Sequence, residues 1–190
     1  MMRVIAGSAK GRRLLTPDGM NTRPTTDMLK EALFGMIQFD VPGAEFLDLF
    51  AGSGGVGLEA LSRGAVSLDC VEQDAKALTC IRTNLKTVGF DQKAKVWPMS
   101  VERALQQFST QGRKFDMIFM DPPYLKGWEE KVAGLISEYG LLKPDGILIV
   151  ESSSETVVRV PGLDVVKEKA YKTTRFTFMQ PAESKESTIE

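Results

Sequence analysis

The 190-residue sequence contains no histidine and only two cysteines. Without histidine, Ser-His-Asp and Cys-His catalysis, imidazole acid–base chemistry and histidine metal sites are all excluded. Cys70 and Cys80 form neither a CxxC pair nor a zinc-binding spacing, so we interpret them as small buried hydrophobic residues. Any chemistry must therefore use carboxylates, backbone groups, hydroxyls, amines or a bound cofactor, and we expect no metal.

Long apolar runs are also missing. No stretch reaches the ~18 apolar residues of a membrane span, and the first residues, MMRVIAGSAKGRR, lack the apolar core of a signal peptide. We therefore expect a cytoplasmic protein that contacts no membrane. The length suits a single α/β domain with a short extension.

Alternating strands and helices begin near residue 45. Such alternation predicts a parallel sheet covered by helices on both faces. Segments 163–172 and 174–180 have no helix between them, which predicts an antiparallel pair at the edge of the sheet. The fold class is therefore α/β with a Rossmann-like, mostly parallel sheet. The predicted strands are 45–50, 66–72, 93–98, 115–120 and 146–152, and the predicted helices are 55–64, 74–88, 101–108 and 128–140.

Residues 1–42 read as an N-terminal extension, made of two short strands around RVIAG and RRLLT and a helix over 25–38. Residues 43–180 would form the main domain, and 181–190 a polar tail. Residues 1–30 carry a net charge of +4 on a chain whose total is −1, which predicts a polyanion-binding surface. A solvated charged face is the alternative. The basic residues are Arg3, Lys10, Arg12, Arg13, Arg23 and Lys30.

A glycine-rich loop follows the first strand of the main domain, in LDLFAGSGGVGLEAL. Gly52, Gly54 and Gly57 give a GxGxxG pattern around Ser53, and Glu72 lies twenty residues after Gly52. Glycines permit close backbone approach, the helix N-terminus offers free N–H groups, and the acid can accept hydrogen bonds from ribose hydroxyls. The pattern predicts nucleotide-type cofactor binding, against the alternative of a tight turn before a packed helix.

Asp48 helps to choose the cofactor class, because a carboxylate suits the ammonium group of a methionyl moiety and would repel a pyrophosphate. Alternatively, it caps backbone N–H groups of the loop. These residues resemble the class I S-adenosylmethionine-dependent methyltransferases. The resemblance implies that Glu72 binds the cofactor ribose and that Ser100 and Val101 lie near the adenine. Ser100 departs from the acid often found there.

The sequence DPPY, residues 121–124, ends the fourth predicted strand of the main domain. Ligands of open α/β sheets bind beyond the carboxyl ends of the strands, so Asp121 and Tyr124 should face the cofactor's methyl group. The Asp121 carboxylate and the Pro122 carbonyl can accept both N–H bonds of an exocyclic amino group. Pro122 and Pro123 hold that geometry rigid, and Tyr124 offers a stacking face for a flipped base. A simple turn is the alternative.

The segments RVIAGSAKGRRL, RPTTDMLKEALFGMI, FLDLFAGSGGVGLEALSRGA, DPPY and KTTRFTF together resemble the RsmD family of bacterial methyltransferases. The resemblance implies methyl transfer to N2 of a guanine in 16S ribosomal RNA, within the assembled or assembling 30S particle. Other bases, N6-adenine of DNA, a protein glutamine and a non-catalytic RNA-binding module are the alternatives. We expect a monomer that binds RNA through Arg12, Arg13 and Arg23.

Overall fold

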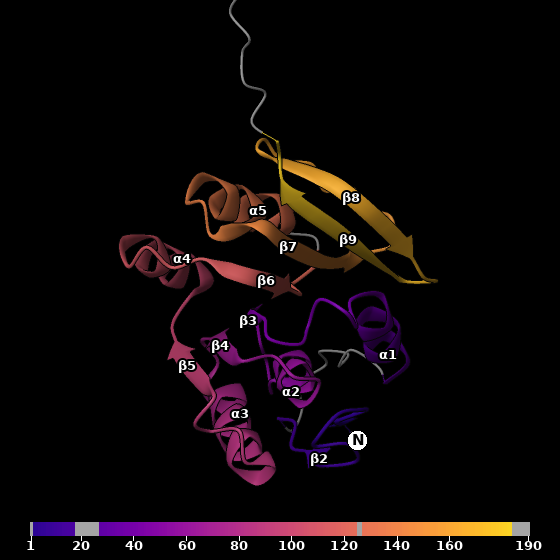
Figure 1. Cartoon of the computed structure of the whole chain (residues 1–190), viewed down its shortest axis with the longest axis vertical. Coiled ribbons are helices and arrows are strands. Elements are labelled where there is room, and N and C mark those ends of the chain that lie inside the picture. The colour runs from indigo at the N-terminus through magenta and orange to yellow at the C-terminus, as the bar shows by residue number, and fades with distance from the viewer. Residues whose placement is uncertain (1, 18–26, 125–126, 184–190) are drawn as a thin grey trace, which may run out of the picture.

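The structure is a computed structural model, and it describes residues 2–17, 27–124 and 127–183. A seven-stranded sheet in the order β5-β4-β3-β6-β7-β9-β8 forms its centre (Figure 1). Strands β3 to β7 pair in parallel, whereas β9 pairs antiparallel with β7 and with β8 at the edge. The predicted fold class is therefore confirmed. The strands are β3 (Glu45–Leu49), β4 (Ser67–Glu72), β5 (Ala94–Pro98), β6 (Phe115–Met120), β7 (Leu142–Ser153), β8 (Leu163–Ala170) and β9 (Thr174–Pro181).

Helices cover both faces of the sheet. Neighbouring residues of β3 point to opposite faces, so Phe46 packs in one apolar core and Leu47 in the other. The first core also holds residues of α1, α2 and α3, and the second holds residues of α4 and α5. None of the described helices is long and apolar enough to cross a membrane. The helices are α1 (Asp27–Met36), α2 (Gly55–Ser62), α3 (Ala75–Val88), α4 (Val101–Thr110) and α5 (Trp128–Glu138).

The N-terminal residues form a small hairpin, β1 (Met2–Arg3) with β2 (Arg13–Leu14). The strands are shorter than predicted, because the N–H groups of Ile5 and Ala6 donate to the carboxylate of Glu59 in α2 instead of to a partner strand. The hairpin also contributes apolar residues to the core around α1, α2 and α3. These residues are Val4, Ala9 and Leu14.

Strand β7 begins earlier than predicted, at Leu142 rather than Gly146. Its pairing with β6 shifts register between Phe115 and Met117, which lets the KPDG stretch remain in the strand. The two cysteines differ in burial: Cys70 is buried in β4, whereas Cys80 on α3 is only half-buried. The expectation of two buried cysteines therefore holds for Cys70 alone.

Candidate cofactor and substrate site

The glycine loop connects β3 to α2 at the carboxyl edge of the sheet. Gly52 and Gly54 have φ angles of 56° and 85°, which L side chains rarely adopt. A Cβ on Gly57 would lie 2.7 Å from the Leu68 side chain, so this glycine lets α2 pack closely on β4. A Cβ on Gly52 would meet nothing within 4 Å. The loop is thus tightly packed at its helix end and open at Gly52.

Glu72, at the end of β4, holds the loop in place. One carboxylate oxygen accepts the N–H of Gly52 at 2.8 Å, and the other accepts those of Gln73 and Asp74 at 2.7 and 2.9 Å. A carboxylate offers about four acceptor positions. Three are used, so the carboxylate has one acceptor position left for a further donor.

Asp48 is 2 % exposed and lies under the loop in β3. Its Oδ2 accepts the N–H of Gly57 at 2.9 Å, so Asp48 does cap a backbone N–H at the start of α2. Burial raises the pKa of Asp48 to about 8, and the charges of Asp121 and Glu72 act in the same direction. A buried carboxylate among other carboxylates attracts a cation, and Asp48 also lines the open cleft. Both interpretations of this residue are therefore compatible.

The DPPY segment follows β6 at the same edge. Asp121 is half-buried, Pro122 is buried, and Tyr124 is 46 % exposed. Burial, followed by the charge of Glu129, raises the pKa of Asp121 to about 7. Glu129 is a buried carboxylate in the first turn of α5, and no local pattern in the sequence predicts its effect on Asp121.

These segments enclose a cleft of about 750 Å³. Its wall includes most of the predicted site: Asp48, Gly52, Ser53, Glu72, Ser100, Val101, Asp121, Pro122, Pro123 and Tyr124. Gly54 does not line the cleft, because its Cα faces Ile81 and Leu58. The lining residues that were not predicted include Met2, Thr16, Pro17, Phe50 and Trp128.

Phe50 and Trp128 form an aromatic pair on the wall of the cleft. Phe50 has a φ of 58°, unusual for a residue other than glycine, and its ring meets that of Trp128 at 5.9 Å and 73°. Strained backbone of this kind concentrates at functional sites. The pair connects the glycine loop to the start of α5 and gives the cleft an apolar surface.

Ser100 and Val101, the two residues expected near the adenine, both line the cleft. Ser100 caps α4 by accepting the N–H of Arg103 at 3.4 Å, so it has a structural role. Glu102, two residues later, lines the cleft and pairs with Lys131 of α5 at 2.9 Å. An acid thus lines the cleft two residues after Ser100, at a position that the sequence analysis did not predict.

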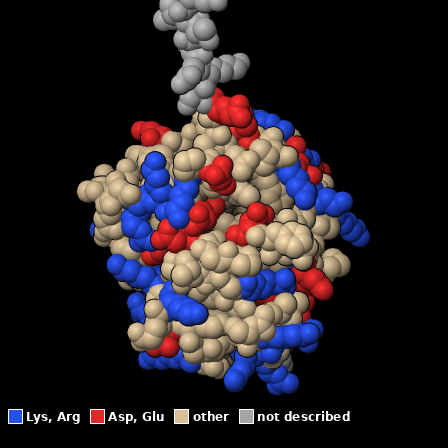
Figure 2. All heavy atoms as spheres, viewed as in Figure 1, with Lys and Arg blue, Asp and Glu red and all other residues tan. Residues whose placement is uncertain are grey.

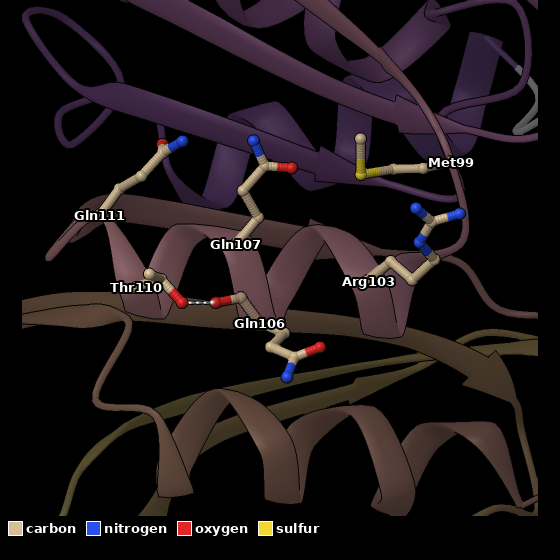
Figure 3. Close-up of a pocket in the computed structure, with 6 residues that line it drawn as sticks. All are labelled: Met99, Arg103, Gln106, Gln107, Thr110 and Gln111. Atoms are coloured by element: carbon tan, nitrogen blue, oxygen red, sulfur yellow. Dashed lines mark hydrogen bonds between the residues drawn. The ribbon is translucent and has the colours of Figure 1, made fainter.

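A second hollow, of about 450 Å³, runs along the outer face of α4 (Figure 3). Its residues extend from separate turns of the helix, and the one hydrogen bond drawn joins the Thr110 hydroxyl to the Gln106 carbonyl at 3.0 Å. No lining carboxylate is present among the residues described there. Since these side chains do not converge, we assign no site to this hollow. It is lined by Met99, Arg103, Gln106, Gln107, Thr110 and Gln111.

The basic residues of the N-terminal segment divide into two groups. Arg12 and Arg13 are exposed, whereas Lys30 is 1 % exposed. The Lys30 ammonium donates to the Arg3 carbonyl and lies 3.5 Å from Glu59, so its inclusion in an RNA-facing run was wrong. Burial lowers the pKa of Lys30 despite the nearby Glu59. Arg23 lies outside the described residues.

Charge is unevenly distributed on the face that carries the cleft. Figure 2 shows acidic side chains around a central hollow and basic side chains to the left, to the right and below it, and the lower ones lie where Figure 1 places the hairpin and α3. An acidic hollow next to a basic surface suits a cationic cofactor beside a polyanionic substrate.

The sheet order, the glycine loop and the carboxylate-lined cleft define a class I methyltransferase fold. The chain belongs to the family described as Conserved hypothetical protein 95, whose model matches residues 2–180. It is 35% identical to the ribosomal RNA small subunit methyltransferase D of Escherichia coli K12 over 154 residues, covering 81% of this chain and 76% of that protein. The protein of the same name from Haemophilus influenzae is 35% identical over 170 residues, covering 88% of each chain.

Solved structures agree with this assignment. The structure of yhhF from Escherichia coli aligns with a TM-score of 0.83 at 33% identity, covering 95% of this chain and 97% of that one. The cofactor of this methyltransferase fold is S-adenosylmethionine. The cleft fits it, because a buried carboxylate can meet its ammonium group, the Glu72 carboxylate can accept a hydroxyl, and the apolar pair of Phe50 and Trp128 lines part of the wall.

Proposed function

We propose that the protein transfers a methyl group to the exocyclic N2 amino group of a guanine in 16S ribosomal RNA. The observation that carries this proposal is the position of DPPY: Asp121, Pro122, Pro123 and Tyr124 all line the same cleft as the glycine loop. The names of the Escherichia coli and Haemophilus influenzae relatives support small-subunit ribosomal RNA as the substrate.

When bound, S-adenosylmethionine supplies an electrophilic methyl group. The chain's own residues must then orient the nitrogen, whose lone pair is delocalised into the guanine ring. The Asp121 carboxylate and the Pro122 carbonyl accept its two N–H bonds and favour tetrahedral geometry at nitrogen. The two prolines fix these acceptors in advance, so that positioning and preorganised electrostatics lower the barrier.

Asp121 also holds the proton that the nitrogen releases. With a pKa near 7, this carboxylate is a better proton acceptor at neutral pH than an ordinary aspartate. Tyr124 lies at the exposed mouth of the cleft, where its ring can stack on a base turned out of the RNA. Orientation, proton acceptance and stacking are thus assigned to three neighbouring residues.

RNA would be held next to this cleft by the N-terminal segment. Residues 31–190 carry a net charge of −5, so the +4 of residues 1–30 supplies the attraction for phosphates. Arg12 and Arg13 are available in the described part of the segment, and we keep Arg23 as a candidate. A small enzyme of this kind can recognise a pre-folded RNA by shape and backbone contacts.

Mass mapping of methylated nucleosides in 16S ribosomal RNA tests the function. RNA from cells that lack the gene should lose one N2-methylguanosine, and a plasmid copy of the gene should restore it. A copy with Asp121→Ala should not. An unchanged guanine pattern together with a missing methyladenosine or methylcytidine would assign the enzyme to another base.

A further inference from the structure

Asn84 of α3 connects two parts of the cleft that are distant in sequence. Its Nδ2 donates to the carbonyls of Leu15 at 2.9 Å and of Ser53 at 3.0 Å, and its Oδ1 accepts the Leu15 N–H at 2.7 Å. The side chain is 1 % exposed. Both amide hydrogens are used, so the orientation of the amide is fixed by its partners.

One of these partners belongs to the N-terminal segment. Leu15 directly follows β2, where pairing with β1 ends. The Asn84 amide therefore takes the place of a strand partner for Leu15 and fixes the course of the chain after the hairpin. The next two residues, Thr16 and Pro17, form part of the cleft wall.

The other partner belongs to the glycine loop. Ser53 is 6 % exposed and lines the cleft together with Gly52, whose N–H is bound by Glu72. Asn84 thus holds the wall at residues 15–17 against the loop at Ser53. A change in either part must stretch or break a buried hydrogen bond of the same amide.

We propose that Asn84 is a positioning residue through which cofactor binding at the glycine loop favours RNA binding by the N-terminal segment. This inference rests on the proposed function, because it takes the hairpin as the RNA-binding part. Occupation of the cleft orders the loop and the wall of residues 15–17 together. The RNA then meets a segment already held in place, and by linkage RNA tightens the cofactor by the same factor.

The hairpin has a separate attachment that does not involve Asn84. Glu59 and Ser62 of α2 bind the backbone N–H groups of Ile5, Ala6 and Ala9 at 2.8 to 3.0 Å. These bonds keep the hairpin on α2 when Asn84 is changed. A variant at Asn84 should therefore keep its fold and lose the connection between loop and wall.

Asn84→Asp is the sharpest variant, because it exchanges only the NH₂ group for an oxygen and turns two attractive contacts into repulsive ones. The probe is the affinity for small ribosomal subunits from cells lacking this gene, measured with and without S-adenosylhomocysteine. For the wild type we expect S-adenosylhomocysteine to tighten subunit binding at least ~5-fold, the lower end of common coupling factors. For Asn84→Asp we expect a ratio near 1.

Two further variants separate positioning from general damage. Thr87→Ala lies on the same helix, is exposed, and loses a hydrogen bond to the Thr83 carbonyl alone, so its coupling should equal that of the wild type. Pro17→Gly leaves all three hydrogen bonds of Asn84 intact but makes the wall of residues 15–17 more flexible. The factor by which S-adenosylhomocysteine tightens subunit binding should therefore lie between the wild-type factor and that of Asn84→Asp.

The outcomes are distinguishable. If Asn84→Asp binds both ligands more weakly but keeps the wild-type ratio, the residue is structural and the inference is wrong. The inference is also wrong if S-adenosylhomocysteine does not change the affinity of the wild type for the subunits. In that case the proposed function would still stand if the wild type methylates the subunits. If the wild type neither binds nor methylates the subunits, the proposed function itself fails.

Discussion

Three carboxylates, those of Asp48, Glu72 and Asp121, lie at one edge of the sheet and line the cleft. The sequence has no histidine that could exchange protons with them. Asp48 and Asp121 both have raised pKa values, because each carboxyl loses hydration in the folded chain and is acted on by the charge of other carboxylates. Such values would be unfavourable in a purely structural site and are typical of sites that bind cations or move protons. Asp48 and Asp121 should therefore each contribute to the pH dependence of the protein.

Replacing Asp121 by alanine should abolish methyl transfer and leave the cofactor dissociation constant within a few-fold of the wild-type value. The variant removes a preorganised acceptor for the target amino group, and losses of this type cost ~10²–10³ in rate. Single-turnover methylation of subunits measures the rate, and calorimetry measures the cofactor affinity. Turnover near that of the wild type would refute the role given to Asp121.

Asp48→Asn should remove a pH dependence of stability. The pKa of this carboxyl lies near 8 in the folded chain against an ordinary value of 3.8. Between these pH values Asp48 keeps its proton in the folded state and has lost it in the unfolded state. The free energy of unfolding therefore falls as pH rises, by at most ~1.4 kcal/mol per pH unit. Urea unfolding of the variant at pH 5 and pH 8 should show a smaller difference than the wild type.

The exposed Asp164 provides the control for this measurement. Asp164→Asn removes the same charge at the surface and should leave the wild-type slope unchanged. We also expect Asp48→Asn to bind the cofactor more weakly, because an amide cannot ionise beside a bound ammonium group as a carboxyl can. Equal slopes in all three proteins would show that Asp48 is ionised in the folded state throughout this range.

Among the elements, α2 connects the cofactor loop to the N-terminal hairpin. It begins at the glycine loop, and its last residue, Ser62, accepts backbone bonds from Ser8 and Ala9. The hairpin approaches so closely that a Cβ on Gly7 would lie 1.8 Å from the Ser62 carbonyl oxygen. Gly7 is thus required by contact with α2 as well as by its φ of 82°.

Gly7→Ala should destabilise the protein more than Gly11→Ala. Both glycines have almost the same φ, 82° and 81°, but a Cβ on Gly11 meets nothing within 4 Å. The backbone strain of ~1–2 kcal/mol is common to both variants, and overpacking adds a further ~1–3 kcal/mol at Gly7 alone. Denaturant unfolding gives the difference, and equal losses would mean that the hairpin can lift from α2 at no cost.

On the scale of the whole molecule, the charges are separated between an acidic remainder and a basic N-terminal segment. Hydrogen bonds from the hairpin to α2 and from α3 to Leu15 fix that segment beside the cleft. The exposed Arg12 and Arg13 are therefore carried by a hairpin that is attached to the sheet domain and not by a free end. RNA affinity and cofactor affinity should accordingly respond to different substitutions.

Neutralising Arg12, Arg13 and Arg23 together should weaken RNA binding and flatten its salt dependence. Each lost phosphate contact lowers the slope of log affinity against log salt by about 0.7–0.9. The cofactor dissociation constant should not change. Lys30→Met is an instructive comparison, because the buried Lys30 should affect folding stability and leave the salt slope as in the wild type. If the triple variant and the wild type show the same slope of log affinity against log salt, the RNA binds to another surface of the protein.

Local patterns in the sequence were sufficient for much of this protein. Alternating strand and helix signals predicted the sheet, and the absence of a helix between segments 163–172 and 174–180 predicted its antiparallel edge. The glycine loop and DPPY were expected at one edge, because parallel strands end on the same side. Periodicity and strand direction depend on neighbouring residues, which a sequence displays directly.

Tertiary structure alone decided the features that join distant residues. Lys30 reads as a surface cation in sequence, yet it is buried against Glu59 and the Arg3 carbonyl, because α1 packs over the hairpin and α2. Likewise Glu129 reaches Asp121 only across the segment between β6 and α5. Asn84 meets Leu15 across 69 positions of the chain. Such contacts are formed by packing after the elements exist, and no local pattern specifies them.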